Sequence, residues 1–376
     1  MARIKQGSAA GAQVLSTRSL NRATLARQWL IGRQRRTPLE AIEHLAGLQA
    51  QAPNPPYYGL WSRLEDFRIE DLTALIQARQ VVRAACQRST LHLMSARDFI
   101  KLRGLFDDMF DRGLRSAHGK ALAGLDIDAI DKAGHALLRK GRLTSAELGA
   151  ELAERWPECD ATSLANVLRC RRALIHQPPA GTWDYNKSAQ LVLAEQWLDT
   201  PVDRKATIDA WVPRYLAAFG PASVKDMQTW SGLTGLAAAF ERQREHLVTF
   251  RDAAGVELFD LPDAPRPDPD APVPPQLLAE FDNLLLSHAD RSRVIATEYQ
   301  RKVMTINGLV RGAVLVDGFV AGIWRIARGK DAASLAIEAF VKIDRKKRDA
   351  LAEEGEKLLA FAAGEGKKFS VEFAAS

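Results

Sequence analysis

Apolar and polar residues follow a helical spacing along the first eighty residues and then alternate as in strands. The apolar residues Leu20, Ala23, Leu25, Trp29 and Leu30 form an imperfect helical stripe. Helices are predicted over 19–31, 38–48, 57–64 and 69–79. Residues 81–94 alternate like two strands, with a turn near 87–90. Helices followed by a β-hairpin are the element order of a winged helix.

The same order of elements returns twice further along the chain, without repeating the same residues. Further helices are predicted over 126–140, 143–156, 160–174, 204–220, 221–233 and 233–243. Each set of three ends in a strand pair: two short strands around Pro178–Gly181 in one case, and a hairpin across Ala254 and Gly255 in the other. We therefore expect a structural repeat of three winged-helix modules.

Seven prolines within 261–275 predict a semi-rigid linker without helix. Beyond it, strands are expected over 293–299, 312–326, 334–340 and 368–374, with a helix over 343–363. Asp317-Gly318 is typical of a type I′ hairpin turn. This end of the chain is expected to form a small barrel or an open sheet with one helix.

The predicted fold class is thus α+β, with three tandem winged-helix modules followed by a β-barrel-like C-terminal domain. A chain of 376 residues is long enough for several such units. The expected boundaries are 15–118, 119–200 and 201–260 for the three modules, 261–275 for the linker, and 276–376 for the C-terminal domain.

Positive charge is concentrated at the start of the chain. Residues 1–120 hold 19 Lys/Arg against 10 Asp/Glu, a net +9, whereas the whole chain carries +6. This distribution favours a polyanionic partner such as nucleic acid, although a mildly basic protein with solvated arginines gives the same numbers. Arg169, Arg171 and Arg172 end the third helix of the second module, where they could contact DNA. Many winged helices mediate only protein contacts, so that alternative stays open.

Several other classes of function have no support in the sequence. The seven histidines and three cysteines show no zinc-ligand spacing, and no phosphate-binding glycine motif is present. No metal and no nucleotide cofactor is therefore expected. No apolar run reaches the roughly 18 residues of a membrane span, and no secretory signal is visible. Three cysteines without a CxxC pair suggest a reduced protein, which we expect in the cytoplasm, associated with the nucleoid.

The segment Gln49-Ala50-Gln51 raises a question of geometry. A helix begins at Pro38 and should end near Gly47, and Ala52 is biased against helical geometry by the proline after it. In an extended chain Gln49 and Gln51 point to one side and Ala50 to the other, whereas on a helix they would diverge by about 200°. Solvated loop glutamines remain the alternative at this point.

His92 lies on the second strand of the first predicted hairpin, and Arg88 and Thr90 share its face if that strand runs straight. These three residues would form a small polar patch on the first wing. Taken alone, His92 could equally be a half-buried strand histidine with a backbone partner.

Five blocks of the sequence together resemble the winged-helix DNA glycosylase superfamily, the AlkZ-like proteins. The blocks are LNRATLARQWL, GLQAQAPNPPYYGLWSRL, RSTLHLM, AFGPASVKDMQTWSGL and FDNLLLSHADRSR. The resemblance extends from about Leu15 to the C-terminus. It implies three tandem winged helices and a C-terminal β-barrel around a DNA channel.

The resemblance also assigns roles to residues. The family's Gln–hydrophobic–Gln motif falls on Gln49-Ala50-Gln51, with Ala50 small for the middle position. It implies Gln49 and Gln51 as catalytic residues and makes His92 a DNA or lesion contact. We expect Arg88 and Thr90 beside His92 to bind DNA as well. The implied activity is that of a monofunctional DNA glycosylase that removes cationic N7-alkylated purines from double-stranded DNA, including bulky natural-product adducts and interstrand crosslinks, in base-excision repair or self-resistance. We expect a monomer. A non-enzymatic winged-helix regulator is the alternative.

Overall fold

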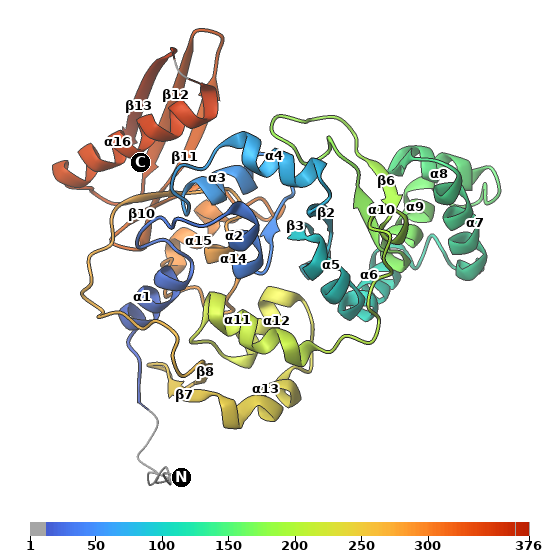
Figure 1. The fold of residues 1–376 in the computed structure, drawn as a ribbon, viewed down its shortest axis with the longest axis horizontal. Coiled ribbons are helices and arrows are strands. Elements are labelled where there is room, and N and C mark those ends of the chain that lie inside the picture. The colour runs from blue at the N-terminus through green and yellow to red at the C-terminus, as the bar shows by residue number, and fades with distance from the viewer. Residues whose placement is uncertain (1–12, 365, 376) are drawn as a thin grey trace.

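The computed structural model describes residues 13–364 and 366–375, and it shows a mixed α+β fold (Figure 1). The chain first forms four helices and a strand, and then two strands and two more helices. These are α1 (Thr17–Arg27), α2 (Pro38–His44), β1 (Leu48–Gln49), α3 (Pro55–Trp61), α4 (Ile69–Gln77), β2 (Val81–Ala85), β3 (Leu91–Ser95), α5 (Ala96–Leu102) and α6 (Asp107–His118). The four predicted helices are confirmed, and α2 begins with the expected capping box between Thr37 and Glu40.

The second group of elements forms the lobe drawn in green on the right of Figure 1. It contains α7 (Ile127–Lys140), β4 (Leu143–Thr144), α8 (Ser145–Ala153), α9 (Ala161–Arg171), β5 (Leu174–His176), β6 (Gln190–Leu193) and α10 (Ala194–Trp197). The strand pair expected around Pro178–Gly181 is wrong in its second member. The strand that pairs with β5 is β6, and residues 177–189 between them are a loop.

Strands of the first two groups join in one sheet of six, in the order β1-β3-β2-β5-β6-β4. The junction is the antiparallel pair of β2 with β5, in which Arg83 lies opposite His176. Because each group alone supplies only three short strands, their pairing removes the two strand edges that would otherwise remain open. The sheet therefore places the second group beside β2, with β3 and β2 between it and β1.

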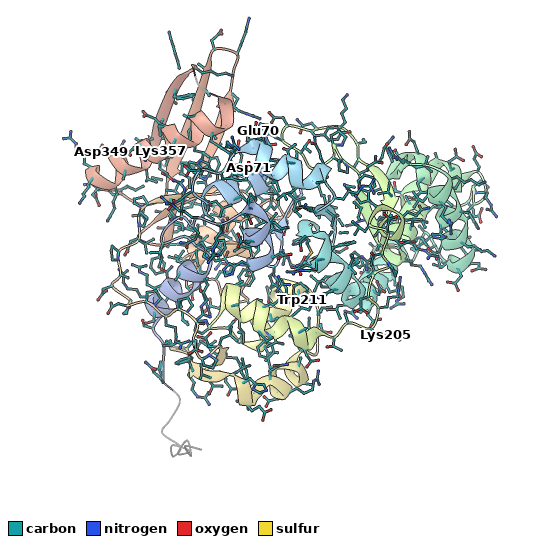
Figure 2. The ribbon with its side chains drawn as sticks, viewed as in Figure 1. Glu70, Asp71, Lys205, Trp211, Asp349 and Lys357 are labelled. Atoms are coloured by element: carbon teal, nitrogen blue, oxygen red, sulfur yellow. The ribbon has the colours of Figure 1, made fainter. Side chains whose placement is uncertain are left out.

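The third group follows the predicted order of helices and hairpin. It contains α11 (Trp211–Phe219), α12 (Val224–Ser231), α13 (Ala237–Gln243), β7 (Val248–Arg251) and β8 (Glu257–Asp260). Helix α12 begins with Ser223 as its N-cap, two residues later than the proline start expected from the sequence. Figure 2 shows Trp211 at the start of α11, facing the middle of the molecule, and this side chain is buried.

The C-terminal part forms an open sheet, so the expected barrel is not found among the described residues. Its elements are β9 (Gln276–Leu278), α14 (Asn283–Leu286), α15 (Thr297–Val303), β10 (Ala313–Val316), β11 (Phe319–Arg328), β12 (Ala332–Ala339), α16 (Arg345–Ala363) and β13 (Lys368–Ala375). The strand order is β13-β12-β11-β10-β9, with β13 parallel to β12 after the α16 crossover. Closure would need β9 to pair with β13, and these strands occupy opposite edges.

Two details of the C-terminal part bear on its predicted strands. The strand expected over 293–299 is wrong. A turn precedes Thr297, and residues Thr297–Val303 form the helix α15. The hairpin at Asp317-Gly318 is confirmed, and both residues have positive φ, 51° and 81°, as a type I′ turn requires. The linker 261–275 contains neither helix nor strand.

Buried ion pairs connect the first helices to distant parts of the chain. Arg63 donates two hydrogen bonds to Asp282, each of 2.8 Å, and Arg27 donates to Asp260 at 2.6 and 2.9 Å. Asn283, next to Asp282, donates to the carbonyl of Gly47 at 2.7 Å. The C-terminal part therefore helps to fix the backbone that leads into β1.

Candidate active site

The turn from α2 into β1 sets the direction of the Gln49-Ala50-Gln51 segment. Ala46 and Gly47 both have positive φ, 54° and 93°, which reverses the chain after the helix. A Cβ at Gly47 would lie 3.1 Å from the Met94 side chain, so glycine suits both the conformation and the space. Gln49 then pairs with His92 on β3. The extended conformation predicted for the motif is present as strand at Gln49 and continues to Ala50, whose N–H donates to the Leu91 carbonyl at 2.7 Å, and a bend lies at Gln51.

Both glutamine side chains turn toward the segment between β2 and β3. The Gln49 Oε1 accepts a hydrogen bond of 2.7 Å from Arg88, and the Gln51 Oε1 accepts one of 2.9 Å from the Leu91 N–H. Since a guanidinium and a backbone N–H can only donate, the oxygen of each amide is identified by its partner. Ala50 between them is fully buried, whereas Gln51 is exposed. Each amide nitrogen keeps its N–H donors for another partner.

Arg88 lies in a short 3₁₀ turn, Gln87–Ser89, and not on a straight strand. Its φ is 53°, so the expected single polar face of Arg88, Thr90 and His92 is wrong: β3 begins only at Leu91. The second donor group of Arg88 reaches the carbonyl of Trp230 at the end of α12. Burial, and less strongly the charge of Arg291, lowers the pKa of Arg88 to about 10, which leaves it charged at neutral pH.

His92 is buried beside Gln49 and is neutral at neutral pH. Its Nδ1–H donates to the carbonyl of Thr90 at 3.0 Å, which leaves Nε2 as an acceptor. Burial, followed by the charge of Arg88, lowers the pKa of His92 to about 3. The Thr90 hydroxyl donates to the carbonyl of Gln87 and so stabilises the turn. His92 cannot supply a proton to a leaving group at neutral pH.

Arg83 and His176 belong to the site but were not identified as site residues from the sequence. The Arg83 Nε donates to the carbonyl of Ala50 at 2.9 Å, and Nη2 donates to that of Gln51 at 3.2 Å. Nη1 donates to the Nδ1 of His176 at 3.1 Å. Burial lowers the pKa of Arg83 to about 10, and burial and the Arg83 charge lower that of His176 to about 3. A lone arginine in the apolar run VVRAA was the available signal.

Four arginines around the turn have no carboxylate partner among the residues that the structure describes. They are Arg83, Arg88, Arg169 and Arg291. Arg169 donates to the carbonyl of Ser89 at 2.6 Å, and Arg291 donates to that of Leu285 at 2.9 Å. Unpaired guanidinium groups are suited to phosphate oxygens. Positive charge is thus concentrated beside the two glutamines.

The other two arginines predicted as DNA contacts are already paired. Arg171 contacts Asp128 at 2.7 Å, and Arg172 donates to both carboxylate oxygens of Asp131, at 2.8 and 2.6 Å. Of the three arginines that end α9, the structure brings only Arg169 to the turn beside Gln49. The difference arises because α7 supplies both aspartates, and sequence spacing does not show which face of α9 they meet.

Residues 42–361 match the family described as "DNA glycosylase AlkZ-like". The chain belongs to the AlkZ-like DNA glycosylase family. Membership identifies an enzyme that acts on DNA and in DNA repair, and it sets aside the non-enzymatic regulator.

A solved structure supports the fold. The "Streptomyces sahachiroi DNA glycosylase AlkZ" is similar with a TM-score of 0.77 and 19% sequence identity, over 96% of this chain and 100% of that one. A comparison with curated protein sequences gives no match. Within the described residues, no helix has the length and apolar character that a membrane crossing needs, and no group of three or more His, Cys, Asp or Glu could hold a metal ion.

Proposed function

We propose that this AlkZ-like glycosylase hydrolyses the N-glycosidic bond of cationic N7-alkylated purines in double-stranded DNA. The observation that carries the proposal is a site with two ordered amides and no acid. Among the described residues, neither the hydrogen bonds nor the pKa-shifting charges of Arg83, Arg88, His92 and His176 involve a carboxylate. The site therefore has no group that could protonate a leaving base.

Such a site matches the needs of a cationic lesion. An N7-alkylated guanine already carries positive charge, so cleavage returns the bonding electrons to the ring and leaves a neutral base. Water then forms the new bond to C1′ and loses a proton to solvent. An ordinary purine needs protonation first, which this site does not offer. Selectivity for alkylated DNA follows from the missing acid.

Gln49 and Gln51 are proposed as the catalytic residues. Each amide oxygen has one lone pair occupied, by Arg88 or by the Leu91 N–H, and keeps the second. The free lone pairs can accept a hydrogen bond from the attacking water or face the oxocarbenium-like sugar. Because both oxygens are already held, little reorganisation is needed when the substrate binds.

Duplex DNA is proposed to lie across the basic turn beside the glutamines. Arg88 and Arg169 are the proposed phosphate contacts, and Thr90 and His92 are proposed to line the lesion side. Arg171 and Arg172 could take part only if DNA displaced their aspartates. The three helix-and-strand groups, 15–118, 119–200 and 201–260, are proposed to act as winged helices that present this surface in a monomer.

Bulky natural-product adducts and interstrand crosslinks are the proposed extension of the substrate range. Gln51 is exposed, and the family resemblance places the motif in the double-glutamine branch. A catalytic amide at the protein surface leaves room for a substituent on N7 of the excised base. Excision is proposed to be monofunctional, so the DNA strand stays intact at the abasic site.

The test is release of bases from duplex DNA treated with a panel of alkylating agents, measured by mass spectrometry. We expect N7-alkylguanines to be released, whereas Gln49→Ala combined with Gln51→Ala abolishes release and leaves DNA affinity within about twofold. Gln77→Ala, at an exposed glutamine on α4, is the matched control and keeps full activity. Full activity in the double variant would contradict the proposal.

A further inference from the structure

Arg83 has a structural environment that ion pairing does not explain. It is the charged residue of β2, it is only 9% exposed, and its partners are carbonyl oxygens and one imidazole nitrogen. A buried charge without a counter-ion is costly, and an apolar residue of similar size would stabilise the strand at least as well. A functional reason for the arginine is therefore needed.

We propose that Arg83 is a positioning residue, which holds the backbone of Ala50 and Gln51 and thereby sets the orientation of the Gln51 amide. This inference rests on the proposed role of Gln51 in base release. Arg83 itself does not touch the substrate, because its donors are directed to these two carbonyls and to His176.

The strand pairing shows how Arg83 acts on the Gln51 side chain. The register that pairs Gln49 with His92 places Ala50 opposite Leu91. In an antiparallel ladder, two opposite residues at a hydrogen-bonded position normally exchange two N–H···O bonds. The Ala50 N–H does donate to the Leu91 carbonyl at 2.7 Å, but the Leu91 N–H donates to the Gln51 Oε1. The Ala50 carbonyl, the normal acceptor, is instead bonded to Arg83.

The ladder bond from the Leu91 N–H to the Ala50 carbonyl is thus absent. Gln51 accepts from the N–H instead, and Arg83 donates to the carbonyl. If Arg83 did not hold the Ala50 carbonyl, that carbonyl would be free to accept from the Leu91 N–H. The Gln51 Oε1 would then lose its donor, and the side chain would gain several rotamers. An amide held in one orientation can direct water, whereas a freely rotating one spends little time in the productive geometry.

The surroundings of Arg83 keep it in this position. A Cβ at Gly181 would lie 2.9 Å from the Arg83 Cδ, so the 177–189 loop packs directly on the side chain. Gly181 has a φ of 93°, which suits glycine. On the other side, His176 accepts from Nη1 and is held neutral by burial and by this charge. The second group of elements therefore contributes to the order of the motif through Arg83.

The first test compares two buried arginines changed to methionine. Arg83→Met removes the donors that hold the motif, whereas Arg103→Met removes donors to the carbonyls of Cys170 and Arg172 and to the carboxylate of Asp107. For Arg83→Met we expect the single-turnover rate of base release to fall about tenfold or more, with the DNA dissociation constant within about twofold. For Arg103→Met we expect a similar loss of thermal stability and a rate within about twofold of wild type.

The second test needs no enzymatic activity. Hydrogen–deuterium exchange followed by mass spectrometry reports on the amide of Leu91. We expect exchange to accelerate in Gln51→Ala, because the Leu91 N–H loses its acceptor while Arg83 still holds the Ala50 carbonyl. Adding Arg83→Met to Gln51→Ala should slow exchange again, because the Ala50 carbonyl is then free to accept from Leu91, whereas Arg103→Met should leave exchange unchanged. His176→Phe, which removes one Arg83 partner and keeps a ring, is the variant to use if Arg83→Met does not fold. It should give the same pattern, with a loss of rate of about threefold.

The outcomes separate this proposal from the proposed function. If wild-type protein releases bases and Arg83→Met, or His176→Phe in its place, releases them equally fast, Arg83 is not a positioning residue. A loss confined to DNA affinity, or an equal loss in Arg103→Met, overturns it as well. If wild-type protein releases no alkylated base while Arg83→Met still reverses the faster Leu91 exchange of Gln51→Ala, the proposed substrate is wrong and the role of Arg83 in holding the motif stands.

Discussion

At the scale of single residues, burial decides which groups near the motif can take part in proton transfer. His92 and His176 are adjacent to unpaired arginines, and burial lowers the pKa of each to about 3. Arg88 stays charged, since its pKa is lowered only to about 10. The chemistry that remains is orientation and electrostatics by neutral amides, which agrees with a substrate that brings its own positive charge.

The first prediction at this scale concerns pH and catalysis. Between about pH 5 and 8 no group at the motif changes charge, because the histidines stay neutral and the arginines stay protonated. The single-turnover rate on a permanently cationic N7-alkylguanine should therefore vary less than about twofold over this range. A bell-shaped rate profile with an inflection near 6.5 would contradict it.

The same pKa shift predicts how stability changes with pH. The folded state depresses the pKa of His92, so below about 6.5 the unfolded chain binds more protons and stability falls as pH falls toward 3. Each pH unit in this window costs about 1.4 kcal/mol per histidine. Melting temperatures of wild type and His92→Gln between pH 7 and 5 should converge, and curves that stay parallel would contradict this prediction.

At the scale of elements, two glycines lie in contrasting backbone environments, one in a turn with positive φ and one inside a helix. Gly47 lies in the turn between α2 and β1, with a φ of 93° and close to Met94, and it directs β1 into the motif. Gly113 lies inside α6, and a Cβ there would meet no atom within 4 Å. The same substitution therefore tests whether local conformation or helix propensity governs each position.

We predict opposite signs for alanine at these two glycines. Gly47→Ala should destabilise the protein by about 1–2 kcal/mol, from positive φ and close contact, and slow base release by disturbing β1. Gly113→Ala should stabilise it by up to about 1 kcal/mol, because alanine favours the helix and loses less entropy. Chemical denaturation and the single-turnover assay check both. Equal effects at the two positions would refute the account of the turn.

At the scale of the whole molecule, buried and exposed ion pairs contribute differently to the stability of the fold. The pair of Arg63 with Asp282 is buried at both ends and joins the first group to the C-terminal part. The pair of Arg328 with Asp184 is partly exposed and joins the 177–189 loop to β11. Because desolvation makes an unpaired buried charge costly, only the first pair should matter strongly for stability.

Asparagine substitutions measure this difference. Asp282→Asn leaves Arg63 charged and buried, and should cost about 3–5 kcal/mol of unfolding free energy. Asp184→Asn should cost no more than about 1 kcal/mol, since solvent screens that pair. Thermal and denaturant unfolding of the two variants, compared with wild type, provide the measurement. A larger loss of unfolding free energy in Asp184→Asn than in Asp282→Asn would contradict this prediction.

DNA binding is a second property of the whole molecule that charge placement predicts. Arg169 is unpaired beside the Gln87–Ser89 turn, whereas Arg172 is neutralised by Asp131. Arg169→Gln should weaken duplex binding and reduce the slope of log affinity against log salt by about one unit. Arg172→Gln should leave the slope unchanged. Titrations of duplex DNA at several salt concentrations measure both slopes. A smaller slope in Arg172→Gln than in Arg169→Gln would contradict the prediction.

Much of the architecture could be predicted because local rules specify it. The capping box of Thr37 and Glu40, the turn at Asp317-Gly318 and the prolines after Ala52 each act through neighbours a few residues away. Apolar spacing likewise predicted the helices of all three groups. The end of α2 before the Gln49-Ala50-Gln51 segment and the strand at Gln49 follow from the same local chemistry, and only resemblance to a family assigned the segment a catalytic role.

Tertiary structure decided what depends on partners far along the chain. Whether the last sheet closes depends on which edges meet, and pairing across long separations leaves no local pattern. The aspartates that neutralise Arg171 and Arg172, the shared sheet of the first two groups, and the arginine that holds the Ala50 carbonyl all bring together residues 30 or more positions apart. Sequence alone determined the two amides and the strand that begins at the motif, whereas folding selected the donors that hold the amide oxygens, because hydrogen bonds and burial depend on proximity in space.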